Sequence, residues 1–185
     1  MPKTARPTAL QSKNKKLTVL ETVLFAMFGA LMFASKVAME ALPNIHLLGM
    51  FIVTLTVVFR KKALIPLYIY VMLEGLFGGF GLWWLPYLYI WTILWAIVML
   101  LPKNMSRKKQ QIVYPLVSCL YGLAFGTLYA PTQALLMGLS FKGMFSWIVA
   151  GLPFDALHAA GNLVTGLLIV PLTELIKKLL KKTNV

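Results

Sequence analysis

Residues 151–166 read GLPFDALHAAGNLVTG, and this stretch opens the last long apolar segment of the chain. Asp155, His158 and Asn162 are spaced i, i+3 and i+7, so on a helix they stack on one face. Ionisable and polar side chains are costly in hydrocarbon and therefore face a protein interior or a watery cavity. We interpret this face as the floor of a small-molecule site in a membrane protein. The alternative is that the three groups only bond neighbouring helices.

The composition of the whole chain predicts a polytopic membrane protein. It has 185 residues, of which 59% are apolar and 12% are charged, whereas soluble domains carry about 25% charged residues. The apolar runs are too many for one soluble core. The formal net charge of +13 does not indicate nucleic-acid binding, because most lysines and arginines lie between or outside the apolar runs.

The basic residues form four clusters that predict the topology. The clusters are Lys3, Arg6, Lys13, Lys15, Lys16; Arg60, Lys61, Lys62; Lys103, Arg107, Lys108, Lys109; and Lys177, Lys178, Lys181, Lys182. Basic loops remain on the cytoplasmic side. The clusters therefore predict an all-α integral membrane protein of the cell membrane, with six transmembrane helices and cytoplasmic N and C termini. A basic N-terminal tail at 1–17, a membrane domain at 18–178 and a basic tail at 179–185 are expected.

The expected helices follow the apolar runs. They are placed at about 18–41, 47–59, 63–78, a fourth ending near 101, 112–130 and 147–175. Pro43 and Pro131 are expected to stop two of them, because proline lacks an N–H and clashes with the preceding turn. The second segment is short for a full span. The expected outer connections are 42–46, 79–86 and 131–146.

Further candidate ligand contacts precede the fourth helix. Glu74 lies near the outer end of the third segment, and residues 78–89 read GGFGLWWLPYLY. Trp and Tyr favour membrane interfaces, which alone would explain Trp83, Trp84 and Tyr87. We also consider these three as an aromatic wall of the ligand site, where stacking and burial provide affinity.

Two features of the first helix are weighed separately. Lys36 and Glu40 are four residues apart, and we expect an ion pair between them, or a Lys36 side chain that extends outward to the membrane surface, rather than direct ligand contact. Ala26, Ala30 and Ala34 form a stripe of small residues where another helix can approach closely. That helix belongs either to the same bundle or to a partner protein.

Several classes of chemistry have no motif in the sequence. We find no Gly-rich phosphate loop, no His-Glu-x-x-His pattern and no nucleophile elbow. Cys119 is the one cysteine, and no Cys/His cluster has metal-site spacing. We therefore expect no enzyme activity, cofactor or metal. The alternatives are a solitary carrier, a channel, or an intramembrane hydrolase that uses Asp155 and His158.

The size, the basic N-terminus, the six expected helices, the alanine stripe and the pattern Asp155…His158…Gly161-Asn162…Gly166 together resemble the substrate-specific (S) component of energy-coupling factor (ECF) transporters. The resemblance implies a membrane protein that captures a vitamin or related micronutrient from outside. A coupling membrane subunit and two ATPase subunits would then drive uptake. It also implies docking through Ala26, Ala30 and Ala34, and ligand contacts from the polar start of the last helix. The ligand itself is not indicated, although the aromatic residues suit a flat heterocycle.

Overall fold

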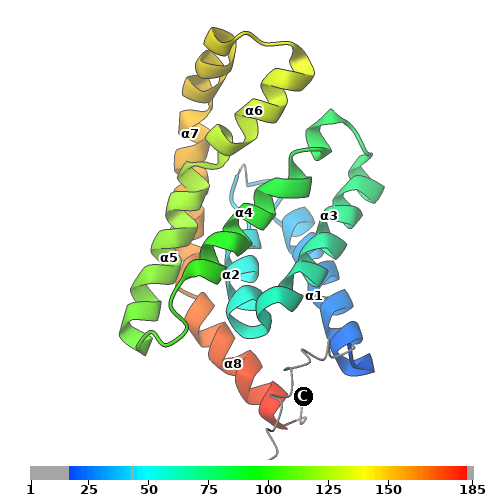
Figure 1. Cartoon of the computed structure of the whole chain (residues 1–185), viewed down its shortest axis with the longest axis vertical. Helices are drawn as coiled ribbons and strands as arrows, with labels where there is room; N and C mark the ends of the chain where they lie inside the picture. Colours follow the sequence, from blue (N-terminus) through cyan, green and yellow to red (C-terminus); the bar gives the residue numbers. More distant parts are fainter. Residues whose placement is uncertain (1–16, 43, 183–185) are drawn as a thin grey trace, which may run out of the picture.

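The structure is a computed structural model that describes residues 17–42 and 44–182, and every regular element in that part is a helix (Figure 1). The elements are α1 (Val19–Ala38), α2 (Leu48–Phe59), η1 (Arg60–Ala63), α3 (Leu64–Gly78), η2 (Leu82–Trp84), α4 (Tyr87–Leu100), α5 (Arg107–Leu123), α6 (Phe125–Met137), α7 (Phe141–Gly166) and α8 (Ile169–Lys182). The expected N-terminal tail up to residue 16, Pro43 and the last three residues lie outside the described residues.

The short helix α2 is the centre of the bundle. All residues from Leu48 to Thr56 are buried, and α2 contacts α1, α4, α5, α7 and α8. Its sequence is apolar all round, which is typical of a helix enclosed by protein. The other helices therefore supply its surroundings, and they bring the candidate site residues of separate segments together around it.

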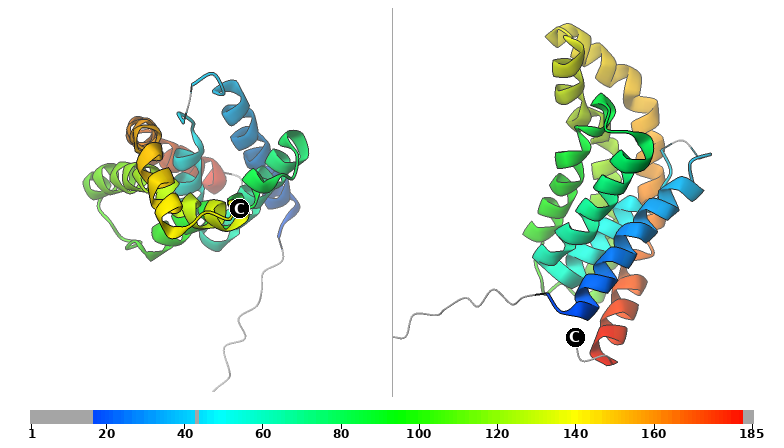
Figure 2. Two further views of the ribbon diagram at one scale, coloured as in Figure 1. Left: turned by 90° about the horizontal axis from the view of Figure 1, so that it is seen from above. Right: turned by 90° about the vertical axis from the view of Figure 1, so that its right-hand side faces the viewer.

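The connections between helices fall at two ends of the bundle (Figure 1). η1, the 101–106 connection and α8 lie at one end, which we call the basic end because it carries the clusters 60–62, 103–109 and 177–182. The 39–47, 79–86 and 138–140 connections lie at the opposite end. There α6 and the start of α7 extend beyond the other helices as a hairpin (Figure 2).

The expectation that Pro131 ends a helix is wrong. Pro131 lies inside α6, and the chain bends instead at Ala124, between α5 and α6. α6 ends at Gly138, whose φ of +63° is a left-handed conformation that glycine adopts readily. The connection expected at 131–146 therefore shrinks to 138–140. Interior prolines are tolerated in apolar helices when neighbouring groups satisfy the freed backbone.

The last expected helix, 147–175, is divided in two. α7 begins earlier, at Phe141, and ends at Gly166, and α8 follows from Ile169. Pro171 explains the break, because a proline ring clashes with the carbonyl four residues earlier, here that of Leu167. α8 continues to Lys182, so the expected boundary at residue 178 falls within a helix.

Among the described residues, three stretches are long and apolar enough to cross a membrane. They are Val19–Ala38, Leu82–Leu100 and Arg107–Met137. Large apolar side chains also remain exposed on the outside of the bundle, such as Leu135 at 82% and Phe141 at 80%. Contiguous exposed apolar surface is unfavourable in water and is typical of contact with lipid or with another protein. These features mark the chain as a membrane protein.

Candidate ligand site

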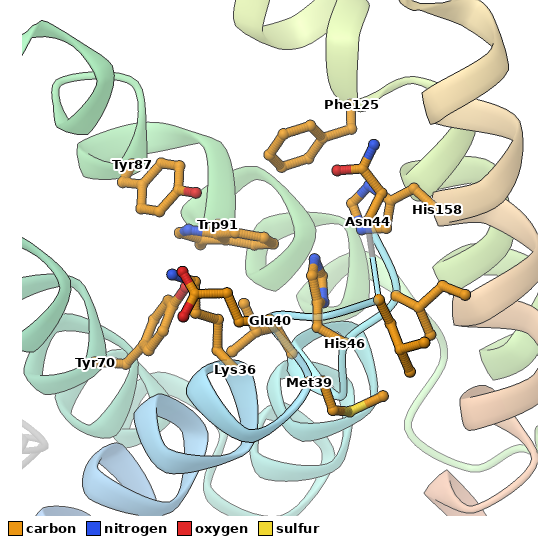
Figure 3. A pocket seen from close by; sticks show the side chains of 13 residues that line it. Lys36, Met39, Glu40, Asn44, His46, Tyr70, Tyr87, Trp91, Phe125 and His158 are labelled. Atoms are coloured by element: carbon orange, nitrogen blue, oxygen red, sulfur yellow. The ribbon is translucent and has the colours of Figure 1, made fainter. Parts of the chain in front are cut away.

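A cavity of about 170 Å³ lies at the end of the bundle opposite the basic end. Residues of α1, the 39–47 connection, α3, α4, α6 and α7 line it, so it collects side chains from most of the chain (Figure 3). Its volume is sufficient for a small ring compound. Ligand pockets in proteins typically combine apolar or aromatic walls with a few convergent polar groups, and both are present here.

Trp91 forms the centre of the aromatic wall. It is 1% exposed and receives edge contacts from His46, Tyr70 and Tyr87, at ring-centroid distances of 5.9, 6.2 and 5.6 Å. Phe125 is tilted against it at 5.3 Å. Edge contacts are a favourable geometry for aromatic pairs, so these rings hold the wall in place from several helices.

Two histidines are in contact with each other where they line the cavity. The rings of His46 and His158 are 4.7 Å apart at 70°, and Phe125 contacts His158 at 4.9 Å. Burial lowers the pKa of His46, in the 39–47 connection, to about 4, so this imidazole is neutral at physiological pH. A neutral imidazole has one donor and one acceptor nitrogen, and each histidine can therefore satisfy either kind of ligand atom.

Unpaired polar atoms concentrate around this cavity. Buried atoms without a hydrogen-bond partner among the described residues include His46 Nδ1, His158 Nε2 and Trp91 Nε1. Tyr70 Oη and Glu74 Oε1, one turn apart on α3, also lack a hydrogen bond of good geometry. Each such atom costs about 1–3 kcal/mol when it is left unsatisfied. Four of these atoms belong to residues that line the first cavity, and Glu74 lines the second, as expected for a site that a polar ligand or water completes.

A second cavity of about 400 Å³ adjoins the first and shares Lys36, Glu40 and Tyr87 with it. Lys36 Nζ lies 3.4 Å from Glu74 Oε2. The expected ion pair between Lys36 and Glu40 is therefore replaced by a pair between α1 and α3. The reason is burial: Glu74 is 2% exposed and needs a counter-charge, whereas Glu40 is exposed.

The predicted row Asp155, His158 and Asn162 is buried on one face of α7, but its members have different surroundings. Of the three, His158 lines the first cavity. Both oxygens of Asp155 accept the backbone N–H of Gly126 at 3.0 and 3.2 Å. A carboxylate at this first turn of α6 is stabilised by the helix dipole. Asp155 is thus engaged by α6 rather than by His158, and the Asp–His pair that a hydrolase would use is not formed.

Asn162 lies at the junction of α2, α5 and α7. Its Nδ2 donates to the carbonyl of Ser118 at 3.1 Å, and its Oδ1 is buried without a described partner. A Cβ at Gly49 would come within 2.7 Å of that oxygen, and one at Gly122 within 2.9 Å of Nδ2. The two glycines let the helices close on the amide. Asn162 is not among the residues that line the first cavity, so its predicted ligand contact remains a prediction.

The aromatic residues before α4 also divide by role. Tyr87 lines both cavities and Trp83 lines the second, at 5.6 Å from Tyr87 in an edge contact. Trp84 Nε1 instead donates to the carbonyl of Val71 at 2.7 Å and packs against Phe80. Trp84 therefore anchors the 79–86 connection to α3.

The centre of the site comprises His46, Tyr70, Trp91 and Phe125. Of these, the sequence placed His46 only among the polar groups of the outer end, and it did not predict the three aromatic residues. One signal was present: Trp83, Tyr87 and Trp91 recur every four residues, which places them on one helix face. Likewise Tyr70 lies four residues before Glu74. For His46 and Phe125 we find no comparable spacing, because they reach the cavity from a connection and from the start of α6.

The alanine stripe of α1 is on the surface. Ala26, Ala30 and Ala34 are exposed, whereas Gly29 is buried against α3, where an added Cβ would collide with the Ile69 side chain. The close helix contact inside the bundle is therefore made by Gly29. The alanines remain accessible to lipid or to another protein.

Within residues 17–42 and 44–182, no group of three or more His, Cys, Asp or Glu is placed to hold a metal ion. No protein-family model matches the chain, and neither the curated proteins nor the solved structures contain a significant match.

Proposed function

We propose that this protein binds a small, flat heterocyclic compound in the two adjoining cavities, as the S component of an ECF transporter in the cell membrane. The observation that carries the proposal is the set of buried atoms without a hydrogen bond on His46, Tyr70, Trp91 and His158 around the first, aromatic cavity, together with Glu74 Oε1 at the second. A protein that bound nothing there would gain stability by replacing these groups with apolar ones.

The chemistry of the unpaired atoms defines what the ligand offers. Trp91 Nε1 is a donor only, so it needs a ligand acceptor, whereas Glu74 Oε1 needs a ligand donor. The histidines match either. A ring edge that alternates ring nitrogens or carbonyls with N–H groups meets these requirements. The planes of Tyr87 and Trp91 are 77° apart, so a flat ring would stack on the face of one and meet the edge of the other. Vitamins with such rings are the proposed ligand class.

The proposed topology has six spans with the basic end in the cytoplasm. In the part of the chain that the structure describes, three segments are long and apolar enough to cross by themselves. α2, α3 and α7 would complete the six inside the bundle, with the short α2 shielded from lipid. Because lysine and arginine are retained on the cytoplasmic side, the ligand site then opens outward. A site loaded from outside is what an uptake protein requires.

The exposed stripe Ala26, Ala30 and Ala34 supports a partner on α1. Small side chains allow two helix backbones to approach closely in a membrane. The proposed partner is the coupling membrane subunit, and two ATPase subunits would provide the energy that this chain has no phosphate-binding motif to supply.

A binding screen on purified protein tests this proposal. Thermal stability is measured with flavins, thiamine, pyridoxine, purines, pterins and corrinoids, because a ligand that binds the native state raises the melting temperature. Trp91→Phe keeps an aromatic ring, although a smaller one, and removes the donor, and it should weaken binding about tenfold.

Trp95→Phe is the matched control on the same helix. Trp95 Nε1 donates to the carbonyl of Arg60 at the basic end, at 3.1 Å, so its loss should lower stability without changing affinity. Equal loss of affinity in both variants, or no stabilising compound in the screen, would refute the site. Uptake that persists in cells without any ATPase module would replace the S-component assignment by a solitary carrier.

A further inference from the structure

A separate cavity of about 200 Å³ lies at the basic end, remote from the candidate ligand site. Arg60 of η1, Lys103 of the 101–106 connection and Lys177 of α8 all line it. These three cations are more than 40 residues apart along the chain, and only the tertiary fold brings them together. None of the described residues that line the cavity is acidic.

Arg60 is held in an unusual conformation at this cavity. Its φ of +54° and ψ of −120° are values that residues with a Cβ rarely adopt. Two hydrogen bonds to α4 maintain it: Arg60 Nη2 donates to the carbonyl of Met99 at 2.9 Å, and Trp95 Nε1 donates to the carbonyl of Arg60 at 3.1 Å. Strained residues persist where the surrounding structure over-determines them, and they cluster at functional sites.

The nearest acid on α8 does not neutralise the cavity. Glu174, one turn before Lys177, accepts hydrogen bonds from Arg107 at 2.7 and 3.4 Å. The charge of Glu174 is thereby balanced by a cation that does not line the cavity. Glu174 also attracts Lys177, but no described acidic residue lines the cavity itself, so Arg60, Lys103 and Lys177 leave it with a net positive charge.

The remaining lining residues suit a ligand with a carbon portion. Val57, Val98 and Leu101 provide apolar surface, and Gln110 and Tyr114 of α5 border it. On α8, Leu175 and Leu179 are exposed at 51% and 53% on a helix that also carries four lysines. A helix with this composition is typical of a membrane surface with anionic lipids.

We propose that this cavity binds a phosphate-bearing anion, supplied by the headgroup of an anionic phospholipid or by a soluble phosphate compound. The Arg60 guanidinium presents a planar fork that matches phosphate oxygens, and the two ammonium groups add charge. The apolar surface contacts the carbon atoms next to the phosphate. This site does not depend on the function proposed above.

The test uses the full chain in neutral detergent. Its melting temperature is measured with phosphatidylglycerol, with phosphatidylcholine, and with glycerol 3-phosphate or inorganic phosphate, and native mass spectrometry counts retained lipids. If the anion is a lipid headgroup, the melting temperature should rise with phosphatidylglycerol but not with phosphatidylcholine or glycerol 3-phosphate. Native mass spectrometry should then show one retained lipid. If the melting temperature rises equally with inorganic phosphate or glycerol 3-phosphate, at concentrations similar to that of phosphatidylglycerol, the site binds a soluble anion.

Matched lysine substitutions separate a site from a diffuse charge effect. Lys103→Gln and Lys177→Gln should each weaken the anion about fivefold, as one lost charge near a membrane surface does. Lys181→Gln removes the same charge from α8 at a residue that does not line the cavity, and it should leave affinity nearly unchanged. An equal loss in all three variants, or no stabilisation by any phosphate compound, would overturn the proposal.

Discussion

Lys36 on α1 and Glu74 on α3 form an ion pair, with 3.4 Å between Nζ and Oε2. The carboxylate is 2% exposed and the lysine is 32% exposed, so one partner is buried and the other reaches the surface. The pair ties α1 to α3 beside the second cavity, which both residues line. It also leaves Glu74 Oε1 without a hydrogen bond of good geometry, beside the Tyr70 hydroxyl, so the pair orients an acceptor at the proposed site.

Replacing Glu74 by Gln should therefore affect both stability and binding. The variant removes the counter-charge of Lys36, and we expect a loss of about 1–3 kcal/mol in the free energy of unfolding, at the lower end because Lys36 reaches water. Ligand affinity should fall as well. Glu40→Gln is the control, because Glu40 is exposed, and it should change stability by less than about 0.5 kcal/mol. Equal changes in the free energy of unfolding for Glu74→Gln and Glu40→Gln, measured by chemical unfolding, would contradict a stabilising role of the ion pair.

Asn162 tests whether the row on α7 binds ligand or joins helices. Its amide donates to Ser118 at a junction of three helices, so Asn162→Ala should lower the free energy of unfolding by about 1–3 kcal/mol. The affinity of the folded fraction should stay unchanged. Leu163→Ala, at a residue that is 40% exposed, should have a smaller effect on stability. A higher dissociation constant with an unchanged melting temperature would instead show that Asn162 contacts the ligand.

The pH dependence of stability should reflect His46. Burial lowers its pKa from 6.5 to about 4, so the unfolded chain binds a proton between these values and the folded chain does not. Stability is then fully present above about pH 6.5 and is lost as the pH falls toward 4. His46→Phe should flatten this slope in thermal unfolding measured from pH 7 to pH 4.5. Parallel curves for the two proteins would show that His46 is not buried in its neutral form.

The proposed orientation can be tested by labelling on intact cells. In a variant with Cys119 replaced by Ser, single cysteines are placed at Asn104, in the 101–106 connection, and at Met137, at the end of α6. Both residues are exposed. If the basic end is cytoplasmic, a membrane-impermeant thiol reagent should label position 137 only. Labelling of position 104 instead would show that the orientation in the membrane is opposite to the one proposed.

The alanine stripe gives a test that separates binding from coupling. Ala30 is exposed, so Ala30→Trp should fold and bind ligand with nearly unchanged affinity, but the bulky ring should prevent close approach of a partner helix and abolish uptake. Met27→Trp, on a neighbouring exposed residue of α1 outside the stripe, should retain more uptake. Normal uptake by the Ala30→Trp variant would show that the stripe is not part of the docking surface.

The sequence by itself determined the class of the protein and the ends of its bundle. Apolar runs interrupted by basic clusters depend only on the cost of charge in hydrocarbon, and this cost is local to each segment. The spacing of Asp155, His158 and Asn162 correctly placed them on one buried face of α7, because helical periodicity is also a local property. Where Pro131 and Pro171 would bend or break a helix was not determined locally, since tolerance of a proline depends on the neighbouring helices.

Tertiary structure alone decided what each polar group contacts. Asp155 meets Gly126 and Asn162 meets Ser118 because glycines let α5, α6 and α2 approach α7 closely. Lys36 pairs with Glu74 rather than with Glu40 because α1 and α3 lie side by side. His46 and His158 are 112 residues apart in the sequence, and their rings are 4.7 Å apart in the fold. No periodicity within one segment encodes such meetings, because the packing of several helices around α2 determines them.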